Sequence, residues 1–247
     1  MEQLSSILNE IDALQGKVKA MRPLSHKQLT ELHHYYKIGL TYASNALEGN
    51  SLNETETRIA IEDGITVAGK PLKDYYEAEG HALAYEKMLK LIKKENISEN
   101  DIKNLHKLFY QKIAPSDAGK YRKIRVFISG SAYQLPPPEN VNMLMKTLCL
   151  SINDSNKDKH PVVQSALAHK DFVFVHPFID GNGRVARLLM NTILLRNNYP
   201  VTLIPPIYRL EYINALEKAH TDDTPFISFI ASCVRQSLWE YIKLLND

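Results

Sequence analysis

Apolar residues recur three and four positions apart along most of the chain, which is the period of amphipathic α-helices. The spacing predicts helices over 2–20, 25–48, about 54–63, 74–95, 98–112, 139–152, 161–174, 184–197 and 226–244. Polar stretches at 96–100 and 153–160 interrupt the pattern without dividing the chain, and no internal repeat is present. The pattern therefore indicates a mostly α-helical protein.

One stretch, "YRKIRVFISGSAYQLPPPENV", departs from the helical period. Ile124, Val126 and Ile128 alternate with other residues, as in a half-buried strand. Gly130 then supplies a turn, and the prolines at 136–138 end the segment. This order predicts a short β-hairpin, because proline cannot continue a strand ladder. We therefore expect an all-α fold that carries one short hairpin.

Composition and charge narrow the class of protein. The chain has 247 residues, 44% of them hydrophobic, which is enough for one substantial core. Its net charge of +2 and scattered basic residues argue against nucleic acid as a partner. Cys149 and Cys233 match neither a disulfide framework nor a zinc site, which favours a reducing, cytoplasmic location. No apolar run is long enough for an export signal or a membrane span, so we expect no membrane contact.

The candidate chemistry lies in "HPFIDGNGRVARLLMN", residues 176–191. Pro177 disfavours a helical conformation at His176, so the preceding helix is expected to end there. The residues "DGNG", 180–183, are then expected to form a turn before a new helix. Gly181 and Gly183 let backbone amides approach a bound group closely. A helix N-terminus of this kind binds anions, and phosphate is the usual one.

Four side chains near this turn add to a phosphate site. Arg184 and Arg187 share one helical face and can each bind phosphate oxygens through two N–H groups. Asp180 can hold a magnesium ion that bridges the same phosphates. His176 can take a proton from a hydroxyl near neutral pH. Each residue alone has an ordinary structural explanation, such as a helix cap or a turn, but their combination favours a phosphate site.

The segment "HPFIDGNGRVAR" resembles the signature of the Fic domain family and fills every position of it. Members of this family are adenylyltransferases that move AMP from ATP to a hydroxyl group of a protein. The resemblance covers residues from about 100 to 200 and implies a Fic-type helical bundle. It implies that His176 is the general base and that Asp180 binds Mg²⁺. No sequence of the form GxxxxGK[ST] occurs, which excludes a P-loop ATPase.

The resemblance also assigns the nucleotide contacts. The amides from Gly181 to Gly183, with Asn182, would bind the α- and β-phosphates of ATP. Arg184 and Arg187 would hold the outer phosphates.

Two further segments resemble parts of the same family. The predicted hairpin is similar to the family's flap, along which an extended target segment adds as a strand. The flap residues implied are Val126, Phe127, Ile128 and Ser129. In "IYRLEYINALEKAH", similar to the segment that holds adenine, Tyr212 is a candidate for stacking and His220 for an edge contact. Tyr212 could equally be a core residue.

The stretch "SNALEGN", residues 44–50, resembles the inhibitory helix of many Fic proteins. Among the glutamates that precede Gly or Asn, only Glu48 has Ser or Thr four residues earlier. That spacing puts Ser44 and Glu48 on one helical face, and Gly49 ends the helix. Glu48 is therefore expected to pair with Arg187 and to remove it from the outer phosphate of ATP.

The sequence divides into an N-terminal helical region with the inhibitory helix (1–98), a Fic core (99–200) and C-terminal helices that complete the core (201–247), expected to form one compact unit. The favoured interpretation is a self-inhibited protein adenylyltransferase that uses ATP and Mg²⁺ on a Ser, Thr or Tyr of a target protein. Two alternatives stay open, namely removal of AMP from a modified protein and a non-catalytic nucleotide-binding regulator. A homodimer is also left open.

Overall fold

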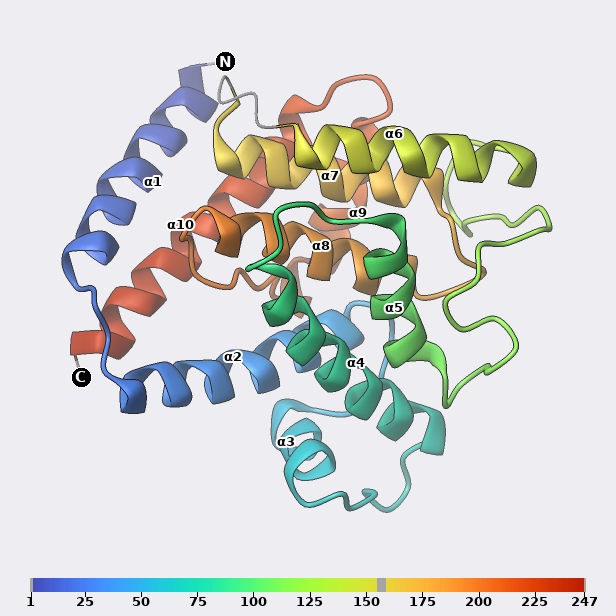
Figure 1. Cartoon of the computed structure of the whole chain (residues 1–247), viewed down its shortest axis with the longest axis horizontal. Coiled ribbons are helices and arrows are strands. Elements are labelled where there is room, and N and C mark those ends of the chain that lie inside the picture. Colours follow the sequence, from blue (N-terminus) through green and yellow to red (C-terminus); the bar gives the residue numbers. More distant parts are fainter. Residues whose placement is uncertain (1, 155–158, 247) are drawn as a thin grey trace.

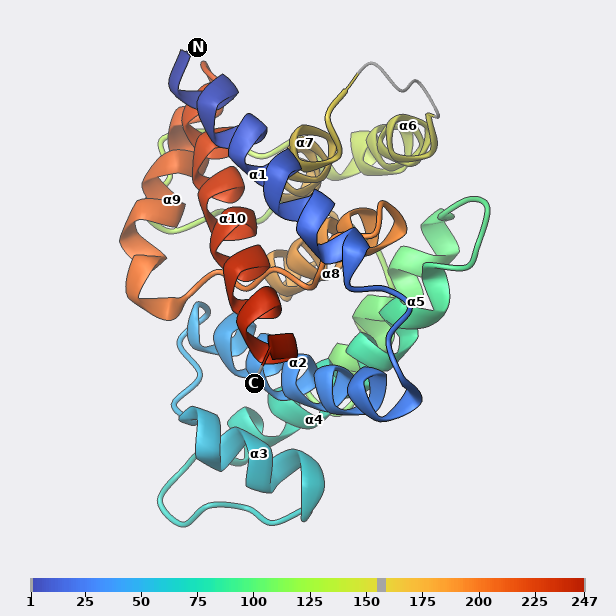
Figure 2. The same cartoon turned by 90° about the vertical axis from the view of Figure 1, so that its left-hand side faces the viewer.

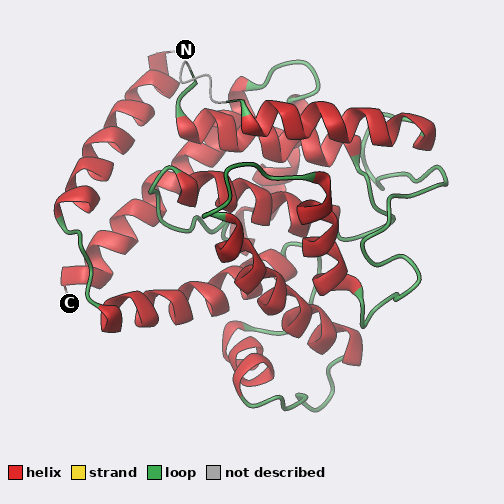
Figure 3. Ribbon diagram, viewed as in Figure 1, coloured by secondary structure: helices red, strands yellow, loops and turns green. Residues whose placement is uncertain are grey.

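The computed structural model describes residues 2–154 and 159–246, and every regular element in these ranges is a helix. Figure 3 shows helices joined by loops, with no strand among the described residues. The elements are α1 (Glu2–Ala20), α2 (His26–Ala46), α3 (Glu54–Glu62), α4 (Leu72–Leu91), α5 (Glu99–Tyr110), η1 (Pro138–Asn140), α6 (Val141–Asn153), α7 (Pro161–Val175), α8 (Asn182–Arg196), η2 (Pro206–Tyr208), α9 (Arg209–Lys218) and α10 (Thr224–Asn246). The expectation of an all-α fold is confirmed.

Helix α8 lies at the centre of the molecule (Figure 1). It packs along α7 and also contacts α2, α4 and α5. Helices α1 and α10 lie side by side at one edge, as the turned view in Figure 2 also shows. Because α8 is covered on most sides, 12 of its 15 residues are buried, including both Arg184 and Arg187. The fold therefore places two arginines in its interior.

The core draws side chains from all three predicted regions. Leu14 of α1, Leu40 of α2, Leu188 of α8 and Val234 of α10 belong to one cluster of buried residues. A second cluster joins α5, α6, α7 and α8 and includes the fully buried Phe172. The helices before and after 99–200 thus bury their apolar faces against it, and this burial is the main favourable contribution to folding.

Helix α2 has well-defined ends, which fix the tip of the predicted inhibitory segment. At its start, the Ser25 hydroxyl accepts from Gln28 N at 3.2 Å and Gln28 Oε1 accepts from Ser25 N at 3.0 Å, a capping box. At its end, Gly49 has a φ of +91°, which glycine adopts without strain. Glu48 therefore lies just beyond the last turn of α2.

The predicted β-hairpin around Gly130 is wrong. Gly130 does form a turn, with a φ of +84°, but the described residues on either side of it form no strand. The guanidinium of Arg122 donates to Ile124 O at 3.2 Å and to Pro136 O at 2.6 Å, so a side chain binds these two carbonyls. The prolines at 136–138 also lack the N–H groups that a ladder requires. The segment is an extended loop.

Helix α9 lies in a stretch for which the spacing predicted no helix. Its apolar Leu210 and Ile213 are 72% and 39% exposed, while Tyr212 and Ala215 are the buried residues. The buried face carries Tyr212, Ala215 and Ala219 at helical spacing, and the exposed Leu210 and Ile213 obscure that pattern. Among the described helices, none has the length and apolar character needed to cross a membrane.

Helices α4 and α5 meet at Gly80, which makes this position a test of the packing. A Cβ there would collide with the carbonyl oxygen of Phe109 and lie 3.1 Å from that of Leu108. We expect Gly80→Ala to destabilise the fold by about 1–3 kcal/mol, because backbone atoms cannot move aside. Urea unfolding measures this change.

Gly16→Ala is the matched control, because Gly16 of α1 has no atom within 4 Å of the added carbon. This substitution should raise the free energy of unfolding by up to ~1 kcal/mol through helix propensity. Equal stability of the two variants would contradict the close approach of α4 and α5.

Candidate active site

Helix α7 ends at His176, whose backbone is fixed in a rare conformation. His176 has φ 48° and ψ 60°, in the left-handed region, which ends the helix. Its N–H donates to Phe172 O at 3.0 Å, and its carbonyl accepts from Arg122 Nε at 2.7 Å. Both backbone groups of His176 are therefore held by the protein.

The imidazole of His176 is oriented by one hydrogen bond. Nδ1 lies 3.3 Å from Val173 O, and since a carbonyl can only accept, Nδ1 carries the proton. Burial, with a smaller contribution from the Arg122 cation, lowers the pKa of His176 to about 4 against the opposing effects of the Val173 bond, Glu48 and Asp180. The ring is therefore neutral at pH 7, with Nε2 able to accept a proton.

Asn182 closes the turn between α7 and α8 with its side chain. Its Oδ1 accepts from Phe178 N and its Nδ2 donates to Phe178 O, both at 2.9 Å. Gly181 has a φ of +79°, and a Cβ there would lie 2.9 Å from Phe109 Cε1. The side chain of Asn182 is thus committed to the turn, so that its backbone N–H is the group left for an anion.

The N-terminus of α8 offers free amides. The first intrahelical bond runs from Val185 N to Gly181 O at 3.1 Å. The N–H groups of Asn182, Gly183 and Arg184 precede it and have no intrahelical acceptor. Together with the helix dipole they form a site that favours an anion.

A carboxylate of the protein itself lies against this N-terminus. Glu48 Oε1 is 2.7 Å from Arg187 Nη2, and it would collide with a Cβ placed on Gly183. Burial alone would raise the pKa of Glu48, but Arg187 and Arg184 outweigh it and lower that pKa. Glu48 is therefore an ionised anion at the start of α8.

Arg187 is 2% exposed, and each of its nitrogens is bound. Nε donates to Ser44 Oγ at 2.9 Å, and Nη2 donates to Ser44 O at 2.8 Å as well as to Glu48. Nη1 donates to the Tyr212 hydroxyl at 3.3 Å. Although burial disfavours the charge, Glu48 and Tyr212 raise the pKa of Arg187. The structure thus brings together Ser44, Glu48 and Arg187, as expected from the sequence.

Tyr212 and His220 lie in aromatic contacts. Tyr212 is 5% exposed, and its hydroxyl is 3.1 Å from His169 Nε2. In this conformation its buried ring offers no open face, so adenine stacking stays a prediction. The ring of His220 lies 3.7 Å from both Phe174 and Tyr133, stacked between them.

Arg184 has a buried carboxylate partner that the sequence reasoning missed. Its Nη1 is 3.0 Å from Glu77 Oε1, and its Nη2 is 3.6 Å from Asp180 Oδ1. Glu77 Oε2 in turn accepts from Asn50 Nδ2 at 2.9 Å. Glu77 belongs to no recognisable sequence motif. An acidic residue in a predicted helix is ordinarily expected to be exposed to solvent. The tip of α2 therefore reaches both arginines, through Glu48 and through Asn50.

Asp180 fits a magnesium ion that arrives with phosphates. Its side chain is 46% exposed, and Oδ1 accepts from Gly181 N at 2.6 Å. Mg²⁺ is commonly held by one or two carboxylates together with substrate phosphates. Within residues 2–154 and 159–246, no cluster of three His, Cys, Asp or Glu side chains could hold a metal ion. The residues present therefore fit a metal bound with a nucleotide.

A second residue missed from the sequence, His106 of α5, holds the backbone at Asp180. Its Nδ1 accepts from Gly119 N at 2.9 Å, so Nε2 carries the proton and donates to Asp180 O at 3.0 Å. The ring also stacks on Phe178 at 3.8 Å. His106 lies in a different helix, far from the motif in sequence, and no local pattern could have revealed it.

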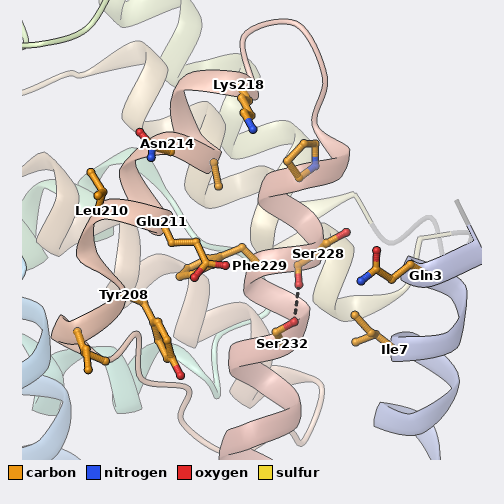
Figure 4. A pocket seen from close by; sticks show the side chains of 13 residues that line it. Gln3, Ile7, Tyr208, Leu210, Glu211, Asn214, Lys218, Ser228, Phe229 and Ser232 are labelled. Atoms are coloured by element: carbon orange, nitrogen blue, oxygen red, sulfur yellow. Dashed lines mark hydrogen bonds between the residues drawn. The ribbon is translucent and has the colours of Figure 1, made fainter.

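A pocket of about 610 Å³ lies elsewhere, between α1, α9 and α10. Figure 4 shows polar side chains there, among them Glu211 and Lys218 of α9 and Ser228 of α10. None of the lining residues belongs to 176–187 or to the tip of α2. The pocket is therefore separate from the anion site.

Comparison with known proteins identifies relatives over the whole chain. Residues 96–194 match the model of the Fic/DOC family. "Protein adenylyltransferase Fic" of Drosophila ananassae is 34% identical over 100% of this chain and 48% of its own length. The chain thus spans about half the length of the curated relatives it matches.

Solved structures agree with this result. Fic-1 of C. elegans superposes with a TM-score of 0.90 at 29% identity, covering 98% of this chain and 73% of that chain. A Fic domain containing signaling protein from Bacteroides thetaiotaomicron has a TM-score of 0.88 at 28% identity, covering 96% and 98% of the two chains.

Buried neutral histidines near the site make stability depend on pH. Burial lowers the pKa of His81 to about 3 and of His176 and His106 to about 4. Between these values and the unfolded pKa near 6.5, the unfolded chain binds more protons, so stability is lost as pH falls through this window. Each buried histidine should lower the free energy of unfolding by up to about 2 kcal/mol as the pH falls from 6.5 to 5.

Urea unfolding at several pH values tests this dependence. His81→Asn keeps a partner for the Thr41 hydroxyl, which lies 3.0 Å from His81 Nδ1, and should reduce the slope. A free energy of unfolding that is constant from pH 7 to 5, or a slope unchanged in the variant, would contradict the assignment.

Proposed function

Residues 96–194 match the Fic/DOC family model, and we propose that the chain is a protein adenylyltransferase of this family inhibited by its own Glu48. It transfers AMP from ATP to a Ser, Thr or Tyr hydroxyl of a target protein. The relatives named protein adenylyltransferase support the reaction. The observation that carries the inhibition is the Glu48 carboxylate, bound by Arg187 against Gly183 at the start of α8.

Nucleotide binding follows from the N-terminus of α8. The free amides of Asn182, Gly183 and Arg184 bind the inner phosphates of ATP. Arg184 and Arg187 bind the outer phosphates, for which guanidinium groups have matching geometry. Asp180 would hold Mg²⁺, which would supply positive charge against the phosphates. Because Glu48 occupies Arg187, the outer phosphate and the carboxylate compete for the same cation.

His176 acts as the general base of the reaction. Its Nε2 takes the proton of the target hydroxyl as the oxygen attacks the α-phosphorus. The new O–P bond forms as the bond from the α-phosphorus to the bridging oxygen breaks, and pyrophosphate leaves with that electron pair. The neutral state of the buried ring fits this role.

The loop after Arg122 presents the target. Val126, Phe127, Ile128 and Ser129 lie in this extended segment, and Phe127 is 86% exposed. An extended target segment can add to it through main-chain hydrogen bonds, with its hydroxyl beside His176. Main-chain recognition carries little sequence information, so it accommodates different targets.

Removal of AMP from a modified protein is the second candidate. Arg187 binds one oxygen of Glu48, Oε1, and 35% of the side chain remains exposed. An ionised carboxylate reached by solvent can orient a water for attack on the AMP phosphorus. In this reaction Glu48 takes part in catalysis.

We also propose a cytoplasmic location. Cys149 and Cys233 are both free, and burial raises their pKa to about 11 and about 12. The thiols are therefore poorly reactive, as suits a reducing compartment. Homodimer formation stays a prediction.

Replacing Glu48 tests the inhibition. Glu48→Gly should raise AMP transfer, because Arg187 becomes free for the outer phosphate of ATP. The effect on rate should exceed the effect on affinity, since most phosphate contacts are unchanged. Incubation of wild-type and variant protein with α-labelled ATP, scoring self-modification and target modification, measures the change.

Arg187→Ala is the control for this experiment. It removes the inhibitory pair and the phosphate contact together, so it should not mimic Glu48→Gly, and the double variant should stay slow. Equal transfer by Glu48→Gly and wild type would contradict inhibition. Release of AMP by wild type that is lost in Glu48→Gly would establish the second candidate instead.

Replacing His176 tests the chemistry. In the Glu48→Gly background, His176→Ala should lower transfer by ~10²–10⁴-fold, the usual cost of losing a positioned base. Calorimetry should show ATP binding largely retained, because the amides and arginines remain. Undiminished transfer would exclude His176 as the base, whereas loss with intact binding would exclude a purely regulatory nucleotide-binding protein.

A further inference from the structure

The guanidinium of Arg122 is buried and hydrogen-bonded entirely to backbone carbonyls. The residue is 3% exposed, and no carboxylate among the described residues perturbs it. Nε donates to His176 O at 2.7 Å, and Nη2 donates to Val175 O at 3.4 Å. Nη1 and Nη2 also donate to Ile124 O at 3.2 Å and Pro136 O at 2.6 Å. A single cation thus joins two segments of the backbone.

A buried charge without a counter-charge is costly unless its donors are satisfied. Here burial lowers the pKa of Arg122, and carbonyl dipoles provide the compensation. A role confined to core packing would be filled by an apolar side chain at lower cost. The five N–H groups of arginine are spread over a fixed plane and can reach carbonyls of two separate segments, whereas the three donors of lysine sit on one atom.

The first segment held by Arg122 is the backbone at His176, the proposed general base. His176 has a left-handed conformation that few residues other than glycine adopt without cost. Arg122 binds its carbonyl, and Arg122 N donates to Pro177 O at 2.8 Å. These two bonds fix the peptide groups on which the direction of the imidazole depends.

The second segment is the loop that contains 126–129. Ile124 and Pro136 lie at its two ends, and Arg122 draws both toward the same cation. The tip is attached separately, because Glu217 Oε1 accepts from Ser131 Oγ at 2.9 Å and from Ala132 N at 2.8 Å. With no strand ladder between its arms, the loop is held at its base by Arg122 and at its tip by Glu217.

We propose that Arg122 is a positioning residue that fixes the target-docking loop relative to His176, so that a docked hydroxyl lies within reach of Nε2. The inference rests on the proposed function, because the loop and the base must act on one substrate. All hydrogen bonds of the Arg122 guanidinium go to carbonyls of the protein's own backbone. Its positive charge additionally supports the neutral form of His176.

The test compares Arg122→Met and Arg122→Lys in the Glu48→Gly background, with Arg196→Met as the matched control. Arg196 also donates to a backbone carbonyl, that of Glu95, but outside the site. Transfer from α-labelled ATP gives kcat and the KM for ATP. Hydrogen exchange followed by mass spectrometry reports on the loop, residues 123–136, independently of activity.

Arg122→Met should lower kcat by ~10–10²-fold, the scale expected for misplacing reacting groups, while the KM for ATP changes by less than about twofold. Exchange over 123–136 should become faster. Arg122→Lys should recover part of both effects, and Arg196→Met should match its parent in both. If Arg122→Met does not fold, Arg122→Lys provides the same comparison.

Unchanged kcat in Arg122→Met, or a lower kcat without faster exchange of the loop, would overturn the proposal. Absence of transfer in Glu48→Gly with Arg122 intact would instead count against the proposed function. In that case the exchange measurement still decides whether Arg122 holds the loop, so the two failures are distinguishable.

Discussion

The buried guanidinium of Arg187 is the constraint on which the arrangement of this site depends. Removing such an ion from water costs several kcal/mol unless its donors are satisfied. Ser44 and Glu48 supply the partners from the end of α2, and Tyr212 supplies one from α9. Helix α8 can therefore carry an arginine in the interior only if α2 ends where it does. The turn at Gly49, whose N–H donates to Ala46 O, fixes that end.

The same requirement explains why the site is closed by the protein's own acids. Arg187 is paired with Glu48, and Arg184 with Glu77 and Asp180. Until an anionic ligand arrives, these carboxylates satisfy cations that would otherwise be buried unpaired. Since Asn50 binds Glu77, displacement of the α2 tip affects both arginines. Inhibition in this account is a competition between anions for cations that are already in place.

The parts of this account that were predictable from sequence are those carried by local patterns. The helical period predicted the all-α fold, and the resemblance of "SNALEGN" to an inhibitory helix predicted that Glu48 pairs with Arg187. The hairpin prediction was wrong because alternation at Ile124–Ile128 does not show whether two arms pair as strands. In the structure, the buried guanidinium of Arg122 binds the carbonyls of Ile124 and Pro136, and the segment forms a loop. Glu77 and His106 were missed because their roles arise only when α4 and α5 pack against α8.

Crystal structures of wild-type protein and Glu48→Gly, each with magnesium and the same non-hydrolysable ATP analogue, test the central claim most directly. The account predicts that in wild type Arg187 keeps its bond to Glu48 and the outer phosphate is displaced from it. In Glu48→Gly the outer phosphate should bind Arg187. An outer phosphate bound to Arg187 in the same position in both structures, with Glu48 still in place, would contradict the competition.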